Sequence, residues 1–181
     1  MKVKAKKSLG QNFLIDKNII NKISSLENIE DQIIFEIGPG SGNLTSALVK
    51  KKPKKIFLIE KDKRYYEMLN KKYKTNNNYK IFNEDILVYN LAKHKCKNAI
   101  VFGNLPYNIS TQILAKFINI EWPPFYKKII FMFQKEVANR ITAKSGSKEF
   151  SRITILSNYR LDILDRFDVS KNSFFPSPKV D

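Results

Sequence analysis

Short apolar runs alternate along this chain with longer amphipathic segments, and that alternation restricts the fold more than any other feature. Apolar runs bounded by turn residues are typical of buried parallel strands, and apolar residues at helical spacing indicate helices between them. Strands are expected at residues 33–37, 55–59, 79–83, 99–102 and 128–133, with a last one at 162–169. Helices are expected at residues 17–25, 44–50, 63–73, 111–117, 134–142 and 149–159. This order predicts one α/β domain over residues 1–181, a doubly wound, mostly parallel, Rossmann-like sheet with helices on both faces.

Composition excludes several classes of protein. The chain has 181 residues, 43% of them hydrophobic, which is enough for one domain with a sizeable core. No apolar run approaches the ~20 residues of a membrane-spanning helix, and no apolar signal segment follows the basic start. We therefore expect a cytoplasmic monomer without membrane contact. One cysteine, Cys96, and one histidine, His94, give no reason to expect a disulfide, a metal site or Ser-His-Asp chemistry.

The strong basic excess favours a polyanionic partner. The formal net charge is +16, from 33 Lys and Arg against 17 Asp and Glu, and such a surface gains free energy by counterion release on nucleic acid. Lysines cluster at residues 2–7 and again at residues 50–55. A chain rich in Lys, Asn and Ile is, however, also what an A+T-biased genome encodes. A loop of like charge is more often solvated than functional, so charge alone leaves nucleic-acid binding open.

A glycine-rich turn, Gly38-Pro39-Gly40-Ser41-Gly42, follows the first expected strand. Glycines let a backbone turn tightly and approach a ligand, and the helix that follows offers N–H groups to an anion such as a methionine carboxylate. A dinucleotide fingerprint needs its third glycine five residues after the first, where Asn43 stands. The turn therefore favours another nucleotide ligand over NAD, although a tight turn with no ligand is also possible.

Acidic residues follow the next two expected strands. Glu60 stands at a position from which a carboxylate can accept hydrogen bonds from ribose hydroxyls. Asp85, after the third strand, can accept from an exocyclic adenine amine. Alternatives stay open for both, because Glu60 can be a solvated acid beside lysines and Asp85 can cap the following turn. Together with the glycine turn, the two acids describe a pocket for an adenosine with an anionic tail.

The fourth strand ends in Asn104-Leu105-Pro106-Tyr107, followed by Asn108-Ile109-Ser110, and this segment carries the chemistry. Pro106 stiffens the turn and holds Leu105 extended, so that the Leu105 carbonyl and the Asn104 amide can both accept from one planar amine. Tyr107 supplies an aromatic face for a base. Hydrogen bonds accepted from an aryl amine raise the electron density on its nitrogen and favour attack on a methyl donor. Ser110 or Thr111 is expected to cap the following helix.

A second aromatic element, Phe174-Phe175-Pro176-Ser177-Pro178, lies near the end of the chain. Its prolines predict a stiff, extended loop. Phe174, or its neighbour Phe175, could cover the other face of a flipped-out base. The alternative is a proline-rich linker with a buried phenylalanine.

Taken together, the motifs resemble those of the ribosomal RNA adenine N6,N6-dimethyltransferases over nearly the whole chain. The matching segments are 9–14 (LGQNFL), 36–40 (EIGPG), Glu60, Glu84-Asp85, 104–110 (NLPYNIS), 134–138 (QKEVA) and 174–180. The resemblance implies S-adenosyl-methionine as methyl donor and ribosomal RNA as substrate. It also implies that Asn12 and Leu14 contact the cofactor together with the positions Gly38, Gly40, Glu60, Asp85 and Asn104. Asn104, Leu105, Pro106, Tyr107 and Phe174 would hold the target adenine.

Within the family, residues Leu9, Gly10 and Leu105 look more like the branch that dimethylates adjacent adenines in a 3′-terminal hairpin of small-subunit 16S RNA. The alternatives are the large-subunit enzymes of macrolide resistance and a non-catalytic nucleic-acid-binding relative. Lys61 departs from the family, which often has an aliphatic residue there, although its methylene stem can still pack on an adenine. Family members also continue into a final strand and a small helical domain, which we expect to be absent from this chain.

Overall fold

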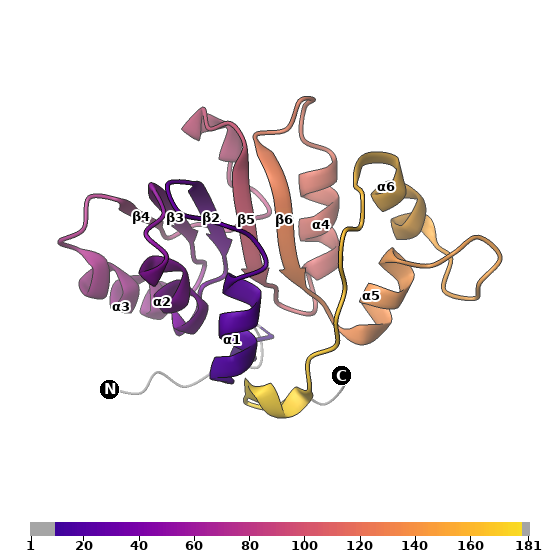
Figure 1. Ribbon diagram of the computed structural model, residues 1–181, viewed down its shortest axis with the longest axis horizontal. Coiled ribbons are helices and arrows are strands. Elements are labelled where there is room, and N and C mark those ends of the chain that lie inside the picture. The colour runs from indigo at the N-terminus through magenta and orange to yellow at the C-terminus, as the bar shows by residue number, and fades with distance from the viewer. Residues whose placement is uncertain (1–9, 179–181) are drawn as a thin grey trace.

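The computed structural model describes residues 10–178 of the chain. The first lysine cluster, at residues 2–7, and the last residues of the matching segment 174–180 lie outside this range. Five parallel strands form the central sheet in the order β4 (Tyr79–Phe82), β3 (Lys55–Ile59), β2 (Ile33–Ile37), β5 (Ala99–Asn104) and β6 (Tyr126–Met132). The strand order reverses between β2 and β5, which confirms the expected doubly wound sheet (Figure 1).

Six α-helices and two short 3-10 helices connect the described strands. The α-helices are α1 (Lys17–Ser24), α2 (Asn43–Lys50), α3 (Lys63–Tyr73), α4 (Ser110–Ile118), α5 (Lys135–Ile141) and α6 (Arg152–Arg160). The 3-10 helices are η2 (Leu91–His94) and η3 (Lys171–Ser173). The strand and helix positions thus agree with the sequence prediction for all five sheet strands and all six α-helices, with shifts only at the ends.

Helices cover both faces of the sheet because alternate strand residues point to opposite sides. On one face Ile34, Leu58 and Phe102 pack against apolar residues of α1, α2 and α3. On the other face Phe35 and Val101 pack against α4 and the segment around η2. Helices α5 and α6 pack on the outer side of α4, beyond β6 (Figure 1). Apart from Glu36 in β2, the buried residues of the central strands are apolar on both sides, as is typical of a parallel sheet between two helical layers.

A second, two-stranded sheet joins the two ends of the described chain. Strand β1 (Phe13–Leu14) pairs antiparallel with β7 (Phe174–Phe175), with Leu14 opposite Phe174. The backbone N–H of Ile15 also donates to the carbonyl of Ser173 at 2.8 Å. The prolines predicted an extended loop at 174–178, but the pairing itself has no signal in the sequence, since neither two-residue strand has a detectable period.

Two predictions of local structure are wrong. The expected strand at 162–169 is irregular, because side chains and not a strand partner hold this segment: Arg166 donates to Thr142 Oγ1 and Asn139 Oδ1, at 2.6 and 2.7 Å. Helix α4 is capped by Ile109 without a side-chain hydrogen bond, while the Ser110 hydroxyl donates to the Tyr107 carbonyl at 3.2 Å. Ser110 therefore stiffens the preceding turn and does not cap the helix.

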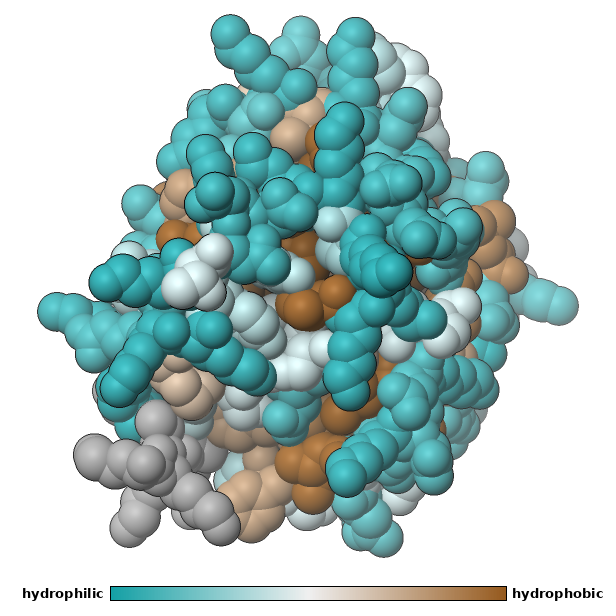
Figure 2. Space-filling view, turned by 60° about the vertical axis from the view of Figure 1, so that its left-hand side comes forward, coloured by the Kyte–Doolittle hydropathy of each residue, from teal (hydrophilic) through white to brown (hydrophobic). Residues whose placement is uncertain are grey.

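The lysines at residues 50–55 lie at the amino ends of the strands, since β3 begins at Lys55. Lys50, Lys52 and Lys54 are exposed there. Figure 2 shows a largely hydrophilic face of the molecule, on which apolar residues reach the surface mainly in a band through its centre and lower part. Within the described residues, no helix is both long and apolar enough to cross a bilayer.

Candidate active site

A cleft opens at the carboxyl edge of the sheet, beside the point where the strand order reverses, which is where open α/β sheets bind their ligands. Its walls come from residues 10–14, 36–41, 43–44, 59–62, 84–87 and 104–109, together with Ile113. Ten of the eleven predicted site residues line it: Asn12, Leu14, Gly38, Gly40, Glu60, Asp85, Asn104, Leu105, Pro106 and Tyr107. Segments that are remote in sequence therefore meet where the prediction expected a common pocket.

The glycine turn after β2 forms one wall. Gly38, Gly40 and Gly42 all have positive φ, of 64°, 53° and 75°, a conformation that only glycine adopts without strain. No atom lies within 4 Å of where a Cβ on Gly38 would stand, apart from its own chain neighbours, so space is open beside its backbone. Gly42 precedes α2 without any side-chain cap. The wall thus offers backbone and a helix N-terminus to a ligand.

Glu60 holds this turn in place. Its carboxylate accepts from the backbone N–H of Gly40 at 2.9 Å with Oε2, and from that of Asp62 at 2.7 Å with Oε1. The residue is only 6% exposed, and burial raises the pKa of its carboxyl above the usual value. Each oxygen keeps a further lone pair for a ligand hydroxyl. The ribose contact remains a prediction, but the structure adds a role that the sequence did not reveal, the clamping of the glycine turn.

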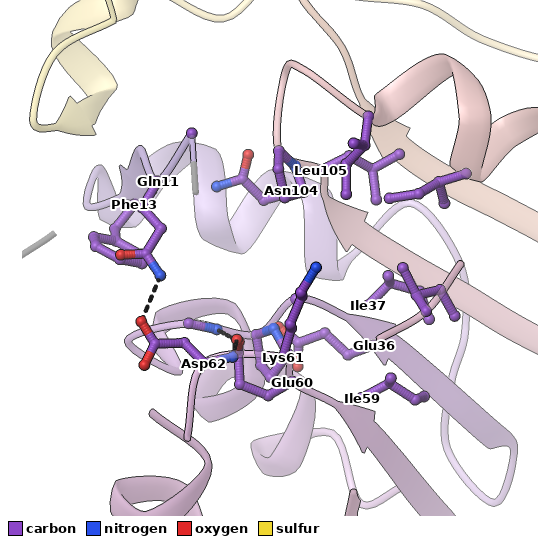
Figure 3. Close-up of a pocket in the computed structure, with 18 of the residues that line it drawn as sticks. Gln11, Phe13, Glu36, Ile37, Ile59, Glu60, Lys61, Asp62, Asn104 and Leu105 are labelled. Atoms are coloured by element: carbon purple, nitrogen blue, oxygen red, sulfur yellow. Dashed lines mark hydrogen bonds between the residues drawn. The ribbon is translucent and has the colours of Figure 1, made fainter. Parts of the chain in front are cut away.

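Asp62 is a site residue that the sequence analysis missed. It caps α3 by accepting from the Arg64 backbone, and it also pairs with the Arg64 guanidinium at 2.6 Å. This pairing, together with the hydrogen bond from Gln11 Nε2 at 3.0 Å, holds the pKa of Asp62 well below its usual range (Figure 3). An aspartate directly before a helix is a recognisable cap, but nothing local indicated its contact with Gln11.

Residues 10–14, which we call the N-terminal strap, line the cleft next to the glycine turn. Asn43 Nδ2 donates to the Leu14 carbonyl at 2.7 Å, which ties the strap to the start of α2. The ring of Phe13 covers the glycine turn so closely that a Cβ on Gly40 would lie 2.6 Å from Phe13 Cε1. The resemblance alone suggested that Asn12 and Leu14 approach the cofactor pocket, and the structure brings both there.

The strap also fixes the orientation of Asn104. The Asn104 Nδ2 donates to the backbone carbonyl of Asn12 at 2.8 Å, and Figure 3 shows the amide reaching towards the strap. A carbonyl can only accept, so this bond assigns the NH₂ group to the strap side and leaves Oδ1 as the acceptor of the amide. Leu105, with a side chain that is 2% exposed, follows at the end of β5 and lines the same cleft.

Asp85 and Lys61 meet at the ends of β4 and β3. Lys61 Nζ lies 2.7 Å from Asp85 Oδ2, while Asp85 Oδ1 accepts from the Leu87 backbone at 2.9 Å. The Lys61 hydrogen bond is the main reason that the pKa of Asp85 lies below its usual value. Both interpretations of Asp85 from the sequence are compatible with this geometry, since it caps a turn and also lines the cleft.

Glu36 is a second acid that the sequence analysis did not select. It lies in β2 below the glycine turn and is 2% exposed. Within residues 10–178 its Oε2 has no hydrogen-bond partner, although the residue lines the cleft. Burial raises the pKa of Glu36 to about 8, with the charge of Glu60 contributing. The carboxyl is therefore mostly protonated near neutral pH and can donate a hydrogen bond.

Phe174 is the one predicted site residue that does not line the cleft. It is 8% exposed and packs in the apolar cluster that contains Leu14, its partner across β1 and β7. Its neighbour Phe175 is 67% exposed. The buried-phenylalanine alternative therefore describes Phe174 in this structure, while its contact with a base remains a prediction.

The donors and acceptors of the cleft fit an adenosine-containing methyl donor. Oxygen acceptors stand at the ends of β3 and β4, open space lies beside the Gly38 backbone, and the buried Glu36 carboxyl has an unsatisfied oxygen. The described residues contain no group of three His, Cys, Asp or Glu side chains that could hold a metal ion. The arrangement matches S-adenosyl-methionine, with its ribose, adenine and amino-acid ends.

Solved structures define the class. The chain is similar to a dimethyladenosine transferase from Plasmodium falciparum, with a TM-score of 0.82 and 32% identity over 93% of this chain and 60% of the other. It is also similar to the 23S rRNA methyltransferase ErmE, with a TM-score of 0.75 and 26% identity over 94% of this chain and 66% of the other. The sheet and its cleft are those of a class I methyltransferase.

Sequence comparisons define the family. The model of the ribosomal RNA adenine dimethylase family matches residues 2–181, and the chain belongs to that family. Proteins named ribosomal RNA small subunit methyltransferase A are similar to it: 47% identity with that of Pelagibacter ubique, over 100% of this chain and 69% of the relative. The relative from Mycoplasmopsis synoviae is also 47% identical, over 98% and 67%. The chain thus spans about two thirds of these relatives, and 60% of the Plasmodium structure.

Proposed function

We propose that this chain transfers methyl groups from S-adenosyl-methionine to N6 of adenines in ribosomal RNA. The specific target we propose is the pair of adjacent adenines in the 3′-terminal hairpin of small-subunit 16S RNA, each of which would be dimethylated. The names of the 47%-identical relatives support the small subunit as substrate. They do not favour the alternatives, a large-subunit target or a non-catalytic factor.

The observation that carries this proposal is the hydrogen bond from Asn104 Nδ2 to the Asn12 carbonyl. It leaves Oδ1 of Asn104 as an acceptor on a residue that lines the cleft beside the glycine turn. We assign this oxygen, together with the Leu105 carbonyl, to the two hydrogens of the adenine amine. Pro106 restricts the turn, and Tyr107 stacks on the base.

The chain's own groups activate the amine by position and charge. When bound, S-adenosyl-methionine supplies an electrophilic methyl group on a positively charged sulfur. The amine is a weak nucleophile because its lone pair is delocalised into the purine ring. Hydrogen bonds accepted by Asn104 and Leu105 draw electron density onto N6, and the cleft holds that nitrogen in line for attack. The proton that the product amine loses is acidic enough to pass to water, so no side chain has to act as a strong base.

The remaining predicted residues hold the cofactor and the RNA. We assign Glu60 to the ribose hydroxyls, Asp85 to the adenine amine of the cofactor, and the backbone near Gly38 and Gly40 to its amino-acid end. Asn12 and Leu14 cover it from the strap. We assign Phe174 to the second face of the target base, which requires the β1–β7 pair to shift. The net charge of +16 supports an RNA partner. We expect the chain to act as a monomer.

The test is methyl transfer from labelled S-adenosyl-methionine by the chain of 181 residues. Small-subunit particles and 16S RNA that lack the methyl groups are the substrates, and nucleoside digestion identifies the product. We expect N6,N6-dimethyladenosine in the small-subunit RNA. Label found only in large-subunit RNA would contradict the proposed target. Absence of transfer to every ribosomal substrate, with S-adenosyl-methionine bound normally, would contradict the activity of this chain.

A further inference from the structure

The ion pair between Lys61 and Asp85 lies where the cofactor's adenine is proposed to bind. Lys61 lies two residues after β3 and Asp85 lies three residues after β4, and these two strands are neighbours in the sheet. Both residues line the cleft, and their charged atoms are 2.7 Å apart. Figure 3 shows the Lys61 side chain extending into the space between the strand-end acids and the Asn104–Leu105 wall.

Both carboxylate oxygens of Asp85 are engaged. Oδ1 accepts from the Leu87 backbone at 2.9 Å, and this bond keeps the carboxylate in one orientation. Oδ2 accepts from Lys61 at 2.7 Å. Each oxygen can accept a second hydrogen bond, but an amine that approaches Oδ2 from the cleft must share that oxygen with the Lys61 ammonium group, which weakens the bond it can form.

The ion pair is weak enough to be exchanged. The side chain of Lys61 is 58% exposed and that of Asp85 is 26% exposed. Ion pairs of this kind contribute little because water screens them and because a long side chain loses rotamer freedom when it is held. Lys61 can return its ammonium to water when another donor takes its place.

We propose that Lys61 sets affinity and specificity at the adenine end of the cofactor site, because its ammonium competes with the 6-amino group for Oδ2 of Asp85. This inference rests on the proposed function, which assigns Asp85 to the cofactor's adenine. It predicts two properties of cofactor binding. Salt, which screens the ion pair, strengthens cofactor binding, and a purine without the amine gains nothing when Lys61 is removed.

The experiment measures binding and not catalysis. S-adenosylhomocysteine is the probe, because it carries the same adenosine and no net charge, and S-inosylhomocysteine is its partner without the 6-amino group. Isothermal titration of both ligands at low and high potassium chloride compares the wild-type chain with Lys61→Met and Lys61→Arg. Lys63→Met is the matched control, because it removes the same charge outside the cleft. The side chain of Lys63 is 78% exposed, and its Nζ lies 4.0 Å from Glu67 Oε1.

We expect Lys61→Met to bind S-adenosylhomocysteine about threefold to fivefold more tightly at low salt, the size of an exposed ion pair. Its affinity for S-inosylhomocysteine stays unchanged or falls, because a 6-oxo group can accept from the lysine. The wild-type chain and Lys61→Arg bind S-adenosylhomocysteine more tightly as salt rises, whereas Lys61→Met does not. Lys63→Met behaves as the wild type does.

A ligand-free measurement checks the ion pair itself. The carboxyl pKa of Asp85, followed by NMR, rises towards its ordinary value in Lys61→Met and stays low in Lys61→Arg and Lys63→Met. Equal or weaker binding of S-adenosylhomocysteine by Lys61→Met, in a chain with the wild-type melting temperature, overturns the inference and leaves the proposed function intact. If the wild-type chain binds neither S-adenosyl-methionine nor its product, the proposed function fails first. If Lys61→Met melts early, Lys61→Leu, which also carries no donor, replaces it with the same expectations.

Discussion

The two walls of the cleft are built in different ways. The cofactor wall, residues 38–42, is held by a side chain: Glu60 accepts from the Gly40 backbone across a separation of 20 residues. The acceptor wall, residues 104–110, is held by a backbone group of the strap: the Asn12 carbonyl accepts from Asn104 across 92 residues. The cofactor wall is thus positioned by a residue at the end of the neighbouring strand, and the acceptor wall by the strap, a segment that lies outside the five-stranded sheet.

The difference between the two walls suggests that one mainly binds the cofactor and the other mainly promotes methyl transfer. Carboxyl groups gather on the cofactor side, where Glu36, Glu60 and Asp62 lie close to the glycine turn, while residues 103–110 contain no carboxyl. Changes on the cofactor side should therefore act mainly on cofactor affinity and on the dependence of stability on pH. Changes on the acceptor side should act mainly on the rate of methyl transfer.

The largest expected effect is on the acceptor wall, in Asn104→Ala. The variant loses the acceptor that polarises the amine, and loss of one such preorganised group typically costs ~10²–10³ in rate. Single-turnover transfer at saturating S-adenosyl-methionine should fall by about that factor, while the affinity for S-adenosylhomocysteine changes less than tenfold. An equal loss of transfer rate and of affinity for S-adenosylhomocysteine would show that the acceptor wall contributes to cofactor binding as much as to methyl transfer.

Asn104→Asp sharpens the same test. A carboxylate keeps an acceptor oxygen but cannot donate to the Asn12 carbonyl, so two acceptors face each other across 2.8 Å in the present geometry. We expect its rate to stay close to that of Asn104→Ala. A rate near that of the wild type would mean that the strap does not orient this side chain.

There is a physical reason why the sequence predicted the cofactor wall better than it predicted the strap that holds the acceptor wall. Gly38, Gly40, Glu60 and Asp85 follow strands whose apolar pattern is visible locally, and parallel strands bring their carboxyl ends to one edge. The strap has no such pattern: β1 and β7 are two residues each, and Gln11 and Phe13 act through contacts with Asp62 and Gly40 that are remote in sequence. Only the family resemblance indicated that the strap approaches the cleft.

The failed strand at 162–169 has a similar cause. Its apolar residues Ile163 and Leu164 are exposed, at 45% and 73%, and Phe167 packs against the helical layer formed by α1 to α3. The pattern is typical of a half-buried strand, but here it belongs to an irregular segment that charged side chains hold in place. The pattern therefore predicted neither the exposure of Ile163 and Leu164 nor the lack of a strand partner, because periodicity does not report whether a hydrogen-bonding strand is available.

The next largest effect concerns the buried acid below the cofactor wall. Burial raises the pKa of Glu36 to about 8 from 4.5, so the folded chain holds a proton that the unfolded chain releases between these values. The free energy of unfolding therefore falls as pH rises from about 4.5 to about 8, by up to ~1.4 kcal/mol per pH unit from this group. Glu36→Gln removes that dependence.

Chemical denaturation from pH 5.5 to 7.5 measures it. The stability of Glu36→Gln relative to the wild type should grow by roughly 2–3 kcal/mol over this range. Glu27→Gln is the control, since Glu27 pairs with Lys128 away from the cleft. A constant difference between Glu36→Gln and the wild type would mean that Glu36 is ionised in the folded chain.

Glu60→Ala tests the side-chain clamp directly. It leaves the Gly40 and Asp62 N–H groups without their acceptor, at a cost of about 1–3 kcal/mol in the free energy of unfolding. Glu60→Gln should not rescue it, because the NH₂ group that replaces one oxygen meets a backbone donor. We expect S-adenosylhomocysteine to bind at least about tenfold more weakly, while the transfer rate at saturating cofactor recovers most of its wild-type value. A transfer rate that stays low at saturating cofactor would show that Glu60 also affects the acceptor wall, so that the two walls do not act independently.

The smallest expected effect is also the one that decides whether the walls are independent. Asn43→Ala removes the hydrogen bond to the Leu14 carbonyl, worth about 1 kcal/mol, and loosens the strap without touching Glu60 or Asn104. Because the strap covers the glycine turn with Phe13 and orients Asn104 with Asn12, both cofactor affinity and transfer rate should fall by about twofold to fivefold, and strap amides should exchange faster. Asn70→Ala is the matched control, because Asn70 is exposed and lies in α3. If only cofactor affinity changes, the strap belongs to the cofactor wall and Asn104 keeps its orientation without it. If both change by a similar factor, one backbone segment couples cofactor binding to the readiness of the methyl-accepting site.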